Sequence, residues 1–162
     1  MGMNNASHFC AGIKFSRRND GKYEILGVVK KRYPRDVCLP GGTNENAPWE
    51  NPEQTFVREF SEETGLTPIT FRLIHSEGSP EHMKNFFVVL SAGGQFNGPK
   101  IVKEPDGDEL TISLWDLAEF GRHLFRNHEP AFLKACAVLA KADASFVGNY
   151  PEICRKIEAF GF

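Results

Sequence analysis

The sequence predicts an α/β (α+β) fold in which a mixed β-sheet is packed between helices, with a helical C-terminal extension from about residue 117. Three observations support this class. β-prone runs open the chain, one well-bounded helix interrupts the strand-like runs, and the remainder is helical in character. Because the chain has 162 residues, of which 41% are hydrophobic, we expect a single domain over residues 1–162.

The first expected elements are two strands, over residues 8–15 and 24–30. A turn-like stretch, Arg18–Gly21, separates them, so they should form a hairpin. Residues 34–42 contain two prolines and two glycines, and we expect a loop or strand end there. The polar stretch 43–50 continues that loop.

The strongest helix signal covers residues 52–64. Asn51 suits the N-cap, and Pro52 suits the first helical position. Gln54 completes a capping-box pair with Asn51, and Gly65 suits the left-handed stop after the last turn. Both ends of this helix are therefore defined by local sequence.

Further strands are expected in three places: residues 69–73, 85–91 and 109–115. Residues 99–107 predict a polar loop. Helices should fill the chain after residue 117. An apolar helix is expected at residues 132–142, and an apolar stripe after Pro151 comprises Ile153, Ile157 and Phe160.

Composition excludes several classes of protein. A net charge of -2 argues against binding of bulk nucleic acid, and the apolar runs are far shorter than the ~18 residues of a membrane span. The first seven residues are polar and Ala6 breaks the myristoylation pattern, so no targeting signal is expected. Four widely spaced cysteines without a C-x-x-C pair predict neither a zinc site nor a disulfide framework, which favours the cytoplasm.

Charge is divided along the chain. Residues 1–40 carry eight Lys or Arg against three acids, whereas residues 45–63 carry six Glu against one Arg. If the fold joins these segments, they could hold an anion and the cations that bridge to it. Two separately solvated surfaces are the alternative interpretation.

Three carboxylates share one face of the predicted helix, because Glu59, Glu62 and Glu63 are at i, i+3 and i+4. Each like-charge pair costs ~0.2–0.5 kcal/mol in an isolated helix, so something else should neutralise them. Clustered carboxylates are ligands suited to Mg²⁺ or Mn²⁺. The sequence therefore predicts a metal site here, the alternative being a solvated acidic face.

The segment Arg58–Leu66 reads R-E-F-S-E-E-T-G-L, and Glu50 lies eight residues before it. With that spacing the chain resembles the signature of the Nudix hydrolase family, G-x5-E-x7-R-E-U-x-E-E-x-G-U, where U is a bulky apolar residue. The match is complete from Glu50 to Leu66. It departs upstream, where seven residues rather than five separate Gly42 from Glu50. This leaves open whether Glu50 or Glu45 takes the usual place.

The resemblance implies a Nudix fold and metal-dependent hydrolysis of a pyrophosphate bond in a nucleoside diphosphate linked to another moiety. Mg²⁺ is the implied cofactor, with Mn²⁺ as a substitute. The implied metal site comprises Glu59, Glu62, Glu63, the Gly42 carbonyl and Glu50. Arg58 would orient the glutamates, and its i, i+4 spacing to Glu62 agrees with that role.

A base or additional ligand is expected outside the helix, among Glu104, Asp106, Asp108 and Glu109. We favour Glu109 because it begins a predicted strand, where its backbone is well fixed. Glu104 is the alternative. A third interpretation is that all four are ordinary loop acids without a catalytic role. The expected catalytic residues are therefore Glu62, Glu63, Glu109 and Arg58.

Substrate recognition is predicted from residues near the glycine turn. Lys30, Arg32 and Arg35 could reach phosphates; alternatively, they are solvated basic side chains at a strand end. Phe87 could stack on a nucleobase; alternatively, it belongs to the core. The expected partner is a small nucleotide, without membrane or bulk nucleic acid, and a homodimer is left open. The alternative function is a non-catalytic, nucleotide-binding Nudix-like domain.

Overall fold

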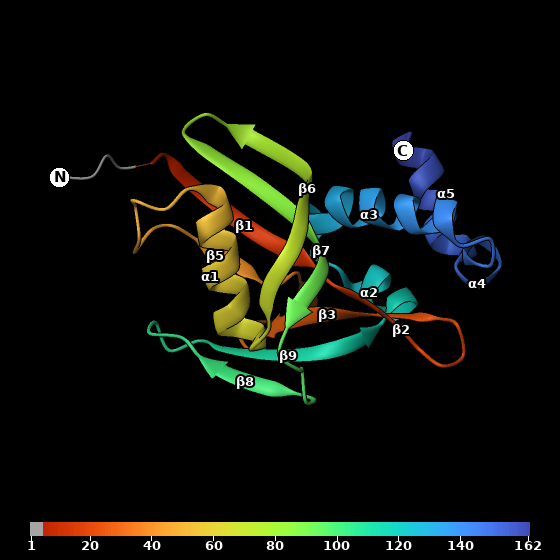
Figure 1. Cartoon of the computed structure of the whole chain (residues 1–162), viewed down its shortest axis with the longest axis horizontal. Helices are drawn as coiled ribbons and strands as arrows, with labels where there is room; N and C mark the ends of the chain where they lie inside the picture. The colour runs from red at the N-terminus through yellow and green to blue at the C-terminus, as the bar shows by residue number, and fades with distance from the viewer. Residues whose placement is uncertain (1–4) are drawn as a thin grey trace.

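The chain forms two β-sheets flanked by helices, and the computed structural model describes residues 5–162 (Figure 1). The expected α/β (α+β) class is confirmed. The expectation about a targeting signal rests partly on residues 1–4, which lie outside the described residues. None of the helices in residues 5–162 is both long and apolar enough to cross a membrane.

The first sheet has four strands in the order β5-β1-β7-β6. Its strands are β1 (Ser7–Ile13), β5 (Gly41–Thr43), β6 (Thr67–Ser79) and β7 (His82–Gly93). β1 runs parallel to β7 and antiparallel to β5. Helix α1 (Pro52–Thr64) packs beside β1 and β5, with Phe56 and Phe60 in the core (Figure 1).

The second sheet has the order β2-β3-β9-β8, with β4 also paired to β3. Its strands are β2 (Phe15–Arg17), β3 (Tyr23–Lys30), β4 (Tyr33–Cys38), β8 (Lys100–Lys103) and β9 (Glu109–Asp116). All of the pairings in this sheet are antiparallel. Apolar side chains of α1 and of both sheets meet in one core cluster.

Two strand predictions are corrected by the structure. The expected strand over residues 8–15 is split at Lys14, where the chain passes from the first sheet to the second, so the hairpin joins β2 rather than β1 to β3. The loop predicted over residues 99–107 contains the whole of β8, whereas residues 34–42, predicted as a loop or strand end, contain parts of β4 and β5. Pro34 is tolerated because β4 lies at an edge, where a missing N–H leaves no gap in a ladder.

The α1 prediction is confirmed at both ends. The helix spans Pro52–Thr64, and the side chains of Asn51 and Gln54 each accept the other's backbone N–H at 2.9 Å. Gly65 has φ 75°, in the left-handed region where a side chain would be unfavourable. The capping residues thus fix where the acidic face begins and ends.

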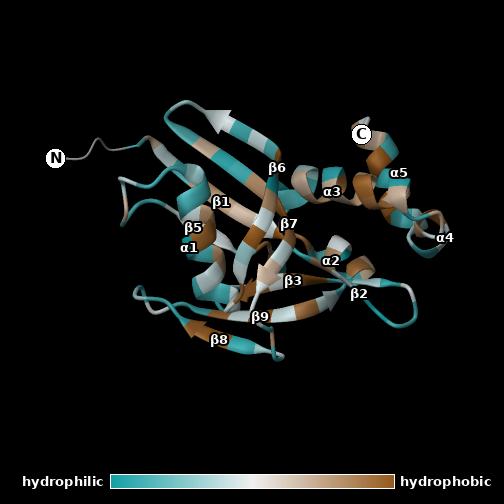
Figure 2. Cartoon of the chain, in the orientation of Figure 1, coloured by the Kyte–Doolittle hydropathy of each residue, from teal (hydrophilic) through white to brown (hydrophobic). Residues whose placement is uncertain are grey.

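Helices fill the C-terminal part, as expected. They are α2 (Leu117–His123), the 3-10 turn η1 (Arg126–His128), α3 (Glu129–Ala142), α4 (Phe146–Asn149) and α5 (Pro151–Phe160). Figure 2 shows hydrophobic residues on α5 and hydrophilic ones in the β2–β3 turn. Ile153 and Ile157 are buried as predicted, whereas Phe160 is 45% exposed.

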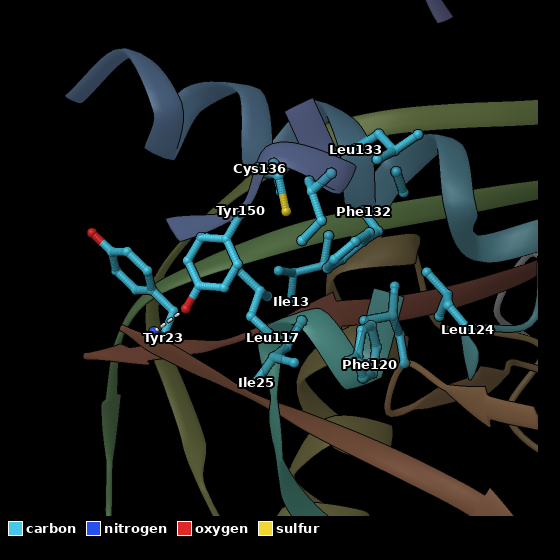
Figure 3. Packing of buried hydrophobic residues seen from close by; sticks show 14 of the residues in the cluster. Ile13, Tyr23, Ile25, Leu117, Phe120, Leu124, Phe132, Leu133, Cys136 and Tyr150 are labelled. Atoms are coloured by element: carbon cyan, nitrogen blue, oxygen red, sulfur yellow. Dashed lines mark hydrogen bonds between the residues drawn. The ribbon is translucent and has the colours of Figure 1, made fainter. Parts of the chain in front are cut away.

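The helical part is joined to the second sheet by a shared core and by hydrogen bonds (Figure 3). Phe120, Phe132 and Ile25 lie in this core. The Tyr23 backbone N–H donates to the Tyr150 hydroxyl at 2.7 Å, so α5 begins directly against β3.

Candidate active site

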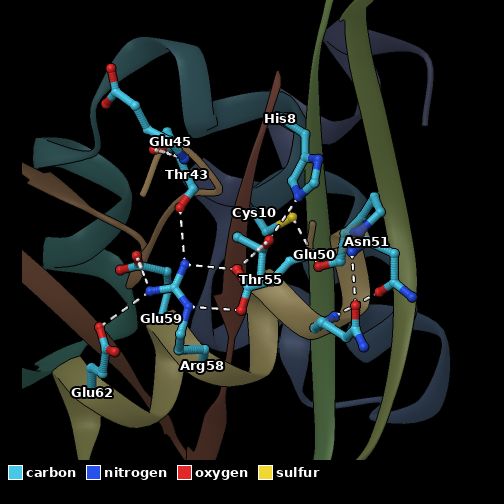
Figure 4. Close-up of polar contacts among 12 residues, drawn as sticks. His8, Cys10, Thr43, Glu45, Glu50, Asn51, Thr55, Arg58, Glu59 and Glu62 are labelled. Atoms are coloured by element: carbon cyan, nitrogen blue, oxygen red, sulfur yellow. Dashed lines mark hydrogen bonds and ion pairs between the residues drawn. The ribbon is translucent and has the colours of Figure 1, made fainter. Parts of the chain in front are cut away.

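Arg58 lies at the centre of the polar network that joins α1 to the preceding loop (Figure 4). Its Nε and Nη2 donate to the two carboxylate oxygens of Glu50 at 2.8 and 2.9 Å. Its Nη1 donates to Glu59 at 2.7 Å, and Nη2 also donates to the Thr43 carbonyl at 3.2 Å. A planar guanidinium that makes several charge-assisted bonds fixes the positions of its partners.

Glu50 is the main partner of Arg58. Its side chain is buried, and the Thr55 hydroxyl also donates to it at 3.1 Å. Hydrogen bonds from Arg58 lower the pKa of Glu50 and outweigh the effect of burial, so the carboxylate stays ionised. Because Arg58 engages both oxygens, Glu50 acts here as an anchor for Arg58. Glu45, the other acid considered for this place, is exposed.

Glu62 and Arg58 also form the expected i, i+4 ion pair. The distance from Glu62 Oε2 to Arg58 Nη1 is 3.5 Å, and the Glu62 side chain is 59% exposed. This contact is weaker than the hydrogen bonds to Glu50 and Glu59. Of Glu59, Glu62 and Glu63, Glu62 is therefore the freest to turn toward a ligand.

β5 lies directly against Glu59. A Cβ atom built on Gly42 would overlap the Glu59 carboxyl group, so only glycine leaves room for that carboxylate. Burial raises the pKa of Glu59, against the opposing effect of Arg58. The elongated loop thus still delivers Gly42 to the acidic face of α1.

Glu63 is the most buried of the three helix carboxylates. It is 6% exposed and accepts the Gly41 backbone N–H at 2.6 Å. Burial raises its pKa to about 8, and the charges of Glu59 and Glu104 act in the same direction. A buried carboxylate of this kind is destabilised as an anion unless a positive charge offsets it.

The carboxylates do not yet form a closed metal cage. Across residues 5–162, no group of three Asp, Glu, His or Cys side chains is arranged to hold an ion as it stands. Glu59 points to Arg58, and Glu63 points to Gly41. The donors nevertheless fit a hard divalent cation, because Mg²⁺ prefers carboxylate oxygens and would neutralise the buried charge of Glu63.

The two candidate bases have different surroundings. The charge of Glu104 is among the smaller causes that raise the pKa of both Glu59 and Glu63. The Glu109 carboxylate instead lies 4.0 Å from the Lys31 ammonium group. The sequence-based preference for Glu109 over Glu104 as the base stays a prediction.

The predicted substrate residues are not brought together. Lys30 lines a pocket that also contains Glu63 and Gly41. The Arg32 side chain lies 3.7 Å from Asp106, and Arg35 lines a separate hollow.

The expected role of Phe87 is corrected by its burial. The ring is 4% exposed and stacks on Phe56 with 4.7 Å between ring centroids, so it cannot stack on a base. Lys84, Phe125 and His128 line the Lys30 pocket instead. No local motif marks these three residues, because only the tertiary fold places them beside α1.

The comparisons with known proteins agree with this geometry. The family model described as NUDIX domain matches residues 12–136, and the chain belongs to the Nudix family. No match was found among curated proteins. The resemblance seen in the sequence is therefore confirmed over most of the chain.

Several solved structures share the fold. A MutT structure from work on Aliivibrio salmonicida and Vibrio cholerae is 23% identical, with 79% of this chain and 94% of that chain covered and a TM-score of 0.57. MutT NUDIX hydrolase from Burkholderia pseudomallei is 22% identical, covering 80% and 98%, with a TM-score of 0.55. The NUDIX domain of Shewanella oneidensis NrtR, complexed with ADP ribose, is 18% identical, covering 85% and 90%, with a TM-score of 0.62.

Proposed function

We propose that this chain is a divalent-metal-dependent hydrolase that cleaves a pyrophosphate bond in a nucleoside diphosphate linked to another moiety. The observation that carries this proposal is the Arg58 network, which holds Glu50 and Glu59 beside the exposed Glu62 and the buried Glu63. This arrangement supplies both anchored and adjustable carboxylates on one helix face.

Each residue has a proposed role. Glu59, Glu62 and Glu63 would hold Mg²⁺ or Mn²⁺, with the Gly42 carbonyl as a further ligand. Bound cations would neutralise the pyrophosphate oxygens, activate water and stabilise the leaving phosphate. Arg58 and Glu50 position the glutamates. Glu104 or Glu109 would accept the proton of the attacking water.

Turnover of a substrate panel tests the proposal. Purified protein with Mg²⁺ would be incubated with nucleoside triphosphates, nucleotide sugars, ADP-ribose, dinucleoside polyphosphates and capped RNA, and the products separated by chromatography. We expect a metal-dependent product from at least one class and none after chelation. Glu62→Gln serves as the matched control, because Glu62 is exposed and its loss leaves the core intact.

The alternative is a nucleotide-binding domain without turnover. The similarity to the ADP-ribose complex of the NrtR NUDIX domain favours it, and another NrtR structure contains a 27mer DNA. The same panel separates the two functions. Tight binding without any metal-dependent product would establish the alternative and reject hydrolysis.

A further inference from the structure

A pocket with two lysines opens beside Glu63. It has a volume of about 210 Å³ and is lined by residues of β1, β3, β4, β5, α1, β7 and η1. Lys30 ends β3 and Lys84 lies near the start of β7, so the two ammonium groups come from different sheets. We call the space lined by Lys30, Lys84, His128 and Thr43 the cationic pocket. Glu63 also lines this pocket, which therefore adjoins the helix carboxylates.

His128 supplies this pocket with a hydrogen-bond donor of fixed tautomer. The Leu39 backbone N–H donates to Nδ1 at 3.1 Å, so Nδ1 carries no proton and the neutral ring keeps its proton on Nε2. Burial and the nearby charges of Lys30 and Lys84 lower the pKa of His128 to about 3. Within residues 5–162, no protein acceptor takes the Nε2 proton, which leaves it for a ligand.

The cationic pocket continues into a second hollow. The two share Lys30, Cys38 and Phe125, and the second is also lined by Tyr33 and Asp36. The Tyr33 side chain is 62% exposed and that of Phe125 37% exposed. An organic ring system could therefore lie on these aromatic side chains while an anionic group occupies the cationic pocket.

We propose that the cationic pocket binds a phosphomonoester carried by the ribose of the substrate's nucleoside diphosphate. This inference rests on the proposed function and narrows its substrate class. A phosphomonoester carries about −1.5 to −2 charges at pH 7 and three acceptor oxygens. Two ammonium groups, the His128 Nε2–H and the Thr43 hydroxyl match that charge and those acceptors.

Matched substrate pairs test the proposal. One pair is ADP-ribose 2′-phosphate and ADP-ribose, and the other is coenzyme A and 3′-dephospho-coenzyme A, which place the phosphate differently. For at least one pair we expect kcat/KM to favour the phosphorylated member by at least about tenfold, equivalent to about 1.4 kcal/mol. A smaller preference in both pairs would refute phosphomonoester binding in the cationic pocket, while the observed turnover would still establish hydrolysis.

Variants of the lysines show whether the preference arises in the pocket. Lys30→Gln and Lys84→Gln should each reduce the ratio of the two kcat/KM values about tenfold. Lys141→Gln, exposed on α3, should leave the ratio unchanged. If each pocket variant slows both members equally, the lysines contact the shared diphosphate and the proposal is wrong.

His128→Asn is a separate test, because asparagine can retain an acceptor for the Leu39 N–H and lacks the Nε2 donor. We expect it to lower the same ratio while the melting temperature shows a folded protein. A folded variant with the full wild-type preference would remove His128 from the phosphate site.

Binding distinguishes failure of the pocket from failure of the proposed function. If no member of either pair is turned over, titration calorimetry of the wild-type protein with Mg²⁺ and the same pairs still applies. A Kd at least about tenfold lower for a phosphorylated member supports the pocket while hydrolysis fails. Equal Kd values within both pairs would refute phosphomonoester binding in the cationic pocket as well.

Discussion

At the scale of single residues, the Glu63 carboxylate lies between α1 and β5 and accepts the Gly41 N–H. Its pKa is raised to about 8, mainly by burial. Folding therefore favours the protonated acid when no cation is bound. Under the proposed function, a bound cation would favour the anion instead.

Glu63→Gln should lower kcat by about 10²- to 10³-fold, because it removes a carboxylate from the proposed cation site. The melting temperature without metal should not fall, because the neutral amide replaces a buried carboxyl group that is already protonated in the metal-free protein. Kinetics and thermal unfolding with and without Mg²⁺ measure both effects. Glu62→Gln should lower kcat similarly without changing the metal-free melting temperature. Full activity in both variants would contradict the assignment of the cation site.

Glu109→Gln should lower kcat by about 10²-fold or more, and Glu104→Gln should have a smaller effect. The physical reason is that Glu109 begins β9, where its backbone is well fixed, whereas Glu104 lies in the turn between β8 and β9. The pH dependence of kcat for both variants tests this ranking. The reverse order would assign the role to Glu104, and near-wild-type rates for both would assign proton removal to a helix glutamate.

At the scale of elements, α1 could be predicted to the residue because its signals are local. Asn51, Pro52, Gln54 and Gly65 act within one turn of the helix ends, and the structure uses all four. The edge strands could not be predicted this way. β4 contains Pro34 and exposed polar residues, and it forms because β3 offers it a partner.

The approach of β5 to α1 predicts the effect of a single methyl group. Gly42→Ala should displace the Glu59 carboxylate and lower kcat/KM by about tenfold or more, because catalytic groups misplaced by about 1 Å lose much of their effect. Stability should change little, since the Glu59 side chain can move. Gly148→Ala is the matched control, because its added Cβ meets no atom within 4 Å. Equal activities would show that Glu59 needs no fixed position.

At the scale of the whole molecule, the helix carboxylates were predictable from sequence, while the pocket beside them was not. Glu59, Glu62 and Glu63 are close in sequence, so helical periodicity places them together. Lys30, Lys84 and His128 are far apart in sequence and meet only because two sheets and η1 converge. Phe87 illustrates the opposite error, since an aromatic side chain suited to stacking is used by the core.

Burial of His128 makes stability depend on pH. Its pKa is about 3 in the folded chain, against an ordinary value of 6.5, so the unfolded chain binds more protons between these values. Stability from this residue is thus present above pH 6.5 and lost as pH falls, by about 2 kcal/mol at pH 5. Denaturant unfolding of wild type and His128→Asn should show a shallower loss in the variant. Parallel curves would mean that His128 is protonated in the folded chain.

The Tyr23 N–H donates a hydrogen bond to the Tyr150 hydroxyl, so the folded domain extends past the last residue that the family model matches. That match ends at residue 136, whereas buried side chains continue to Ile157. Proteolytic cleavage in the exposed turn around Ala144 would sever Tyr150 from the rest of the chain. Dissociation of the severed fragment would then leave a strand amide and part of the core open to water. The last helices therefore complete the hydrophobic core of the domain, and their loss after proteolysis would expose it.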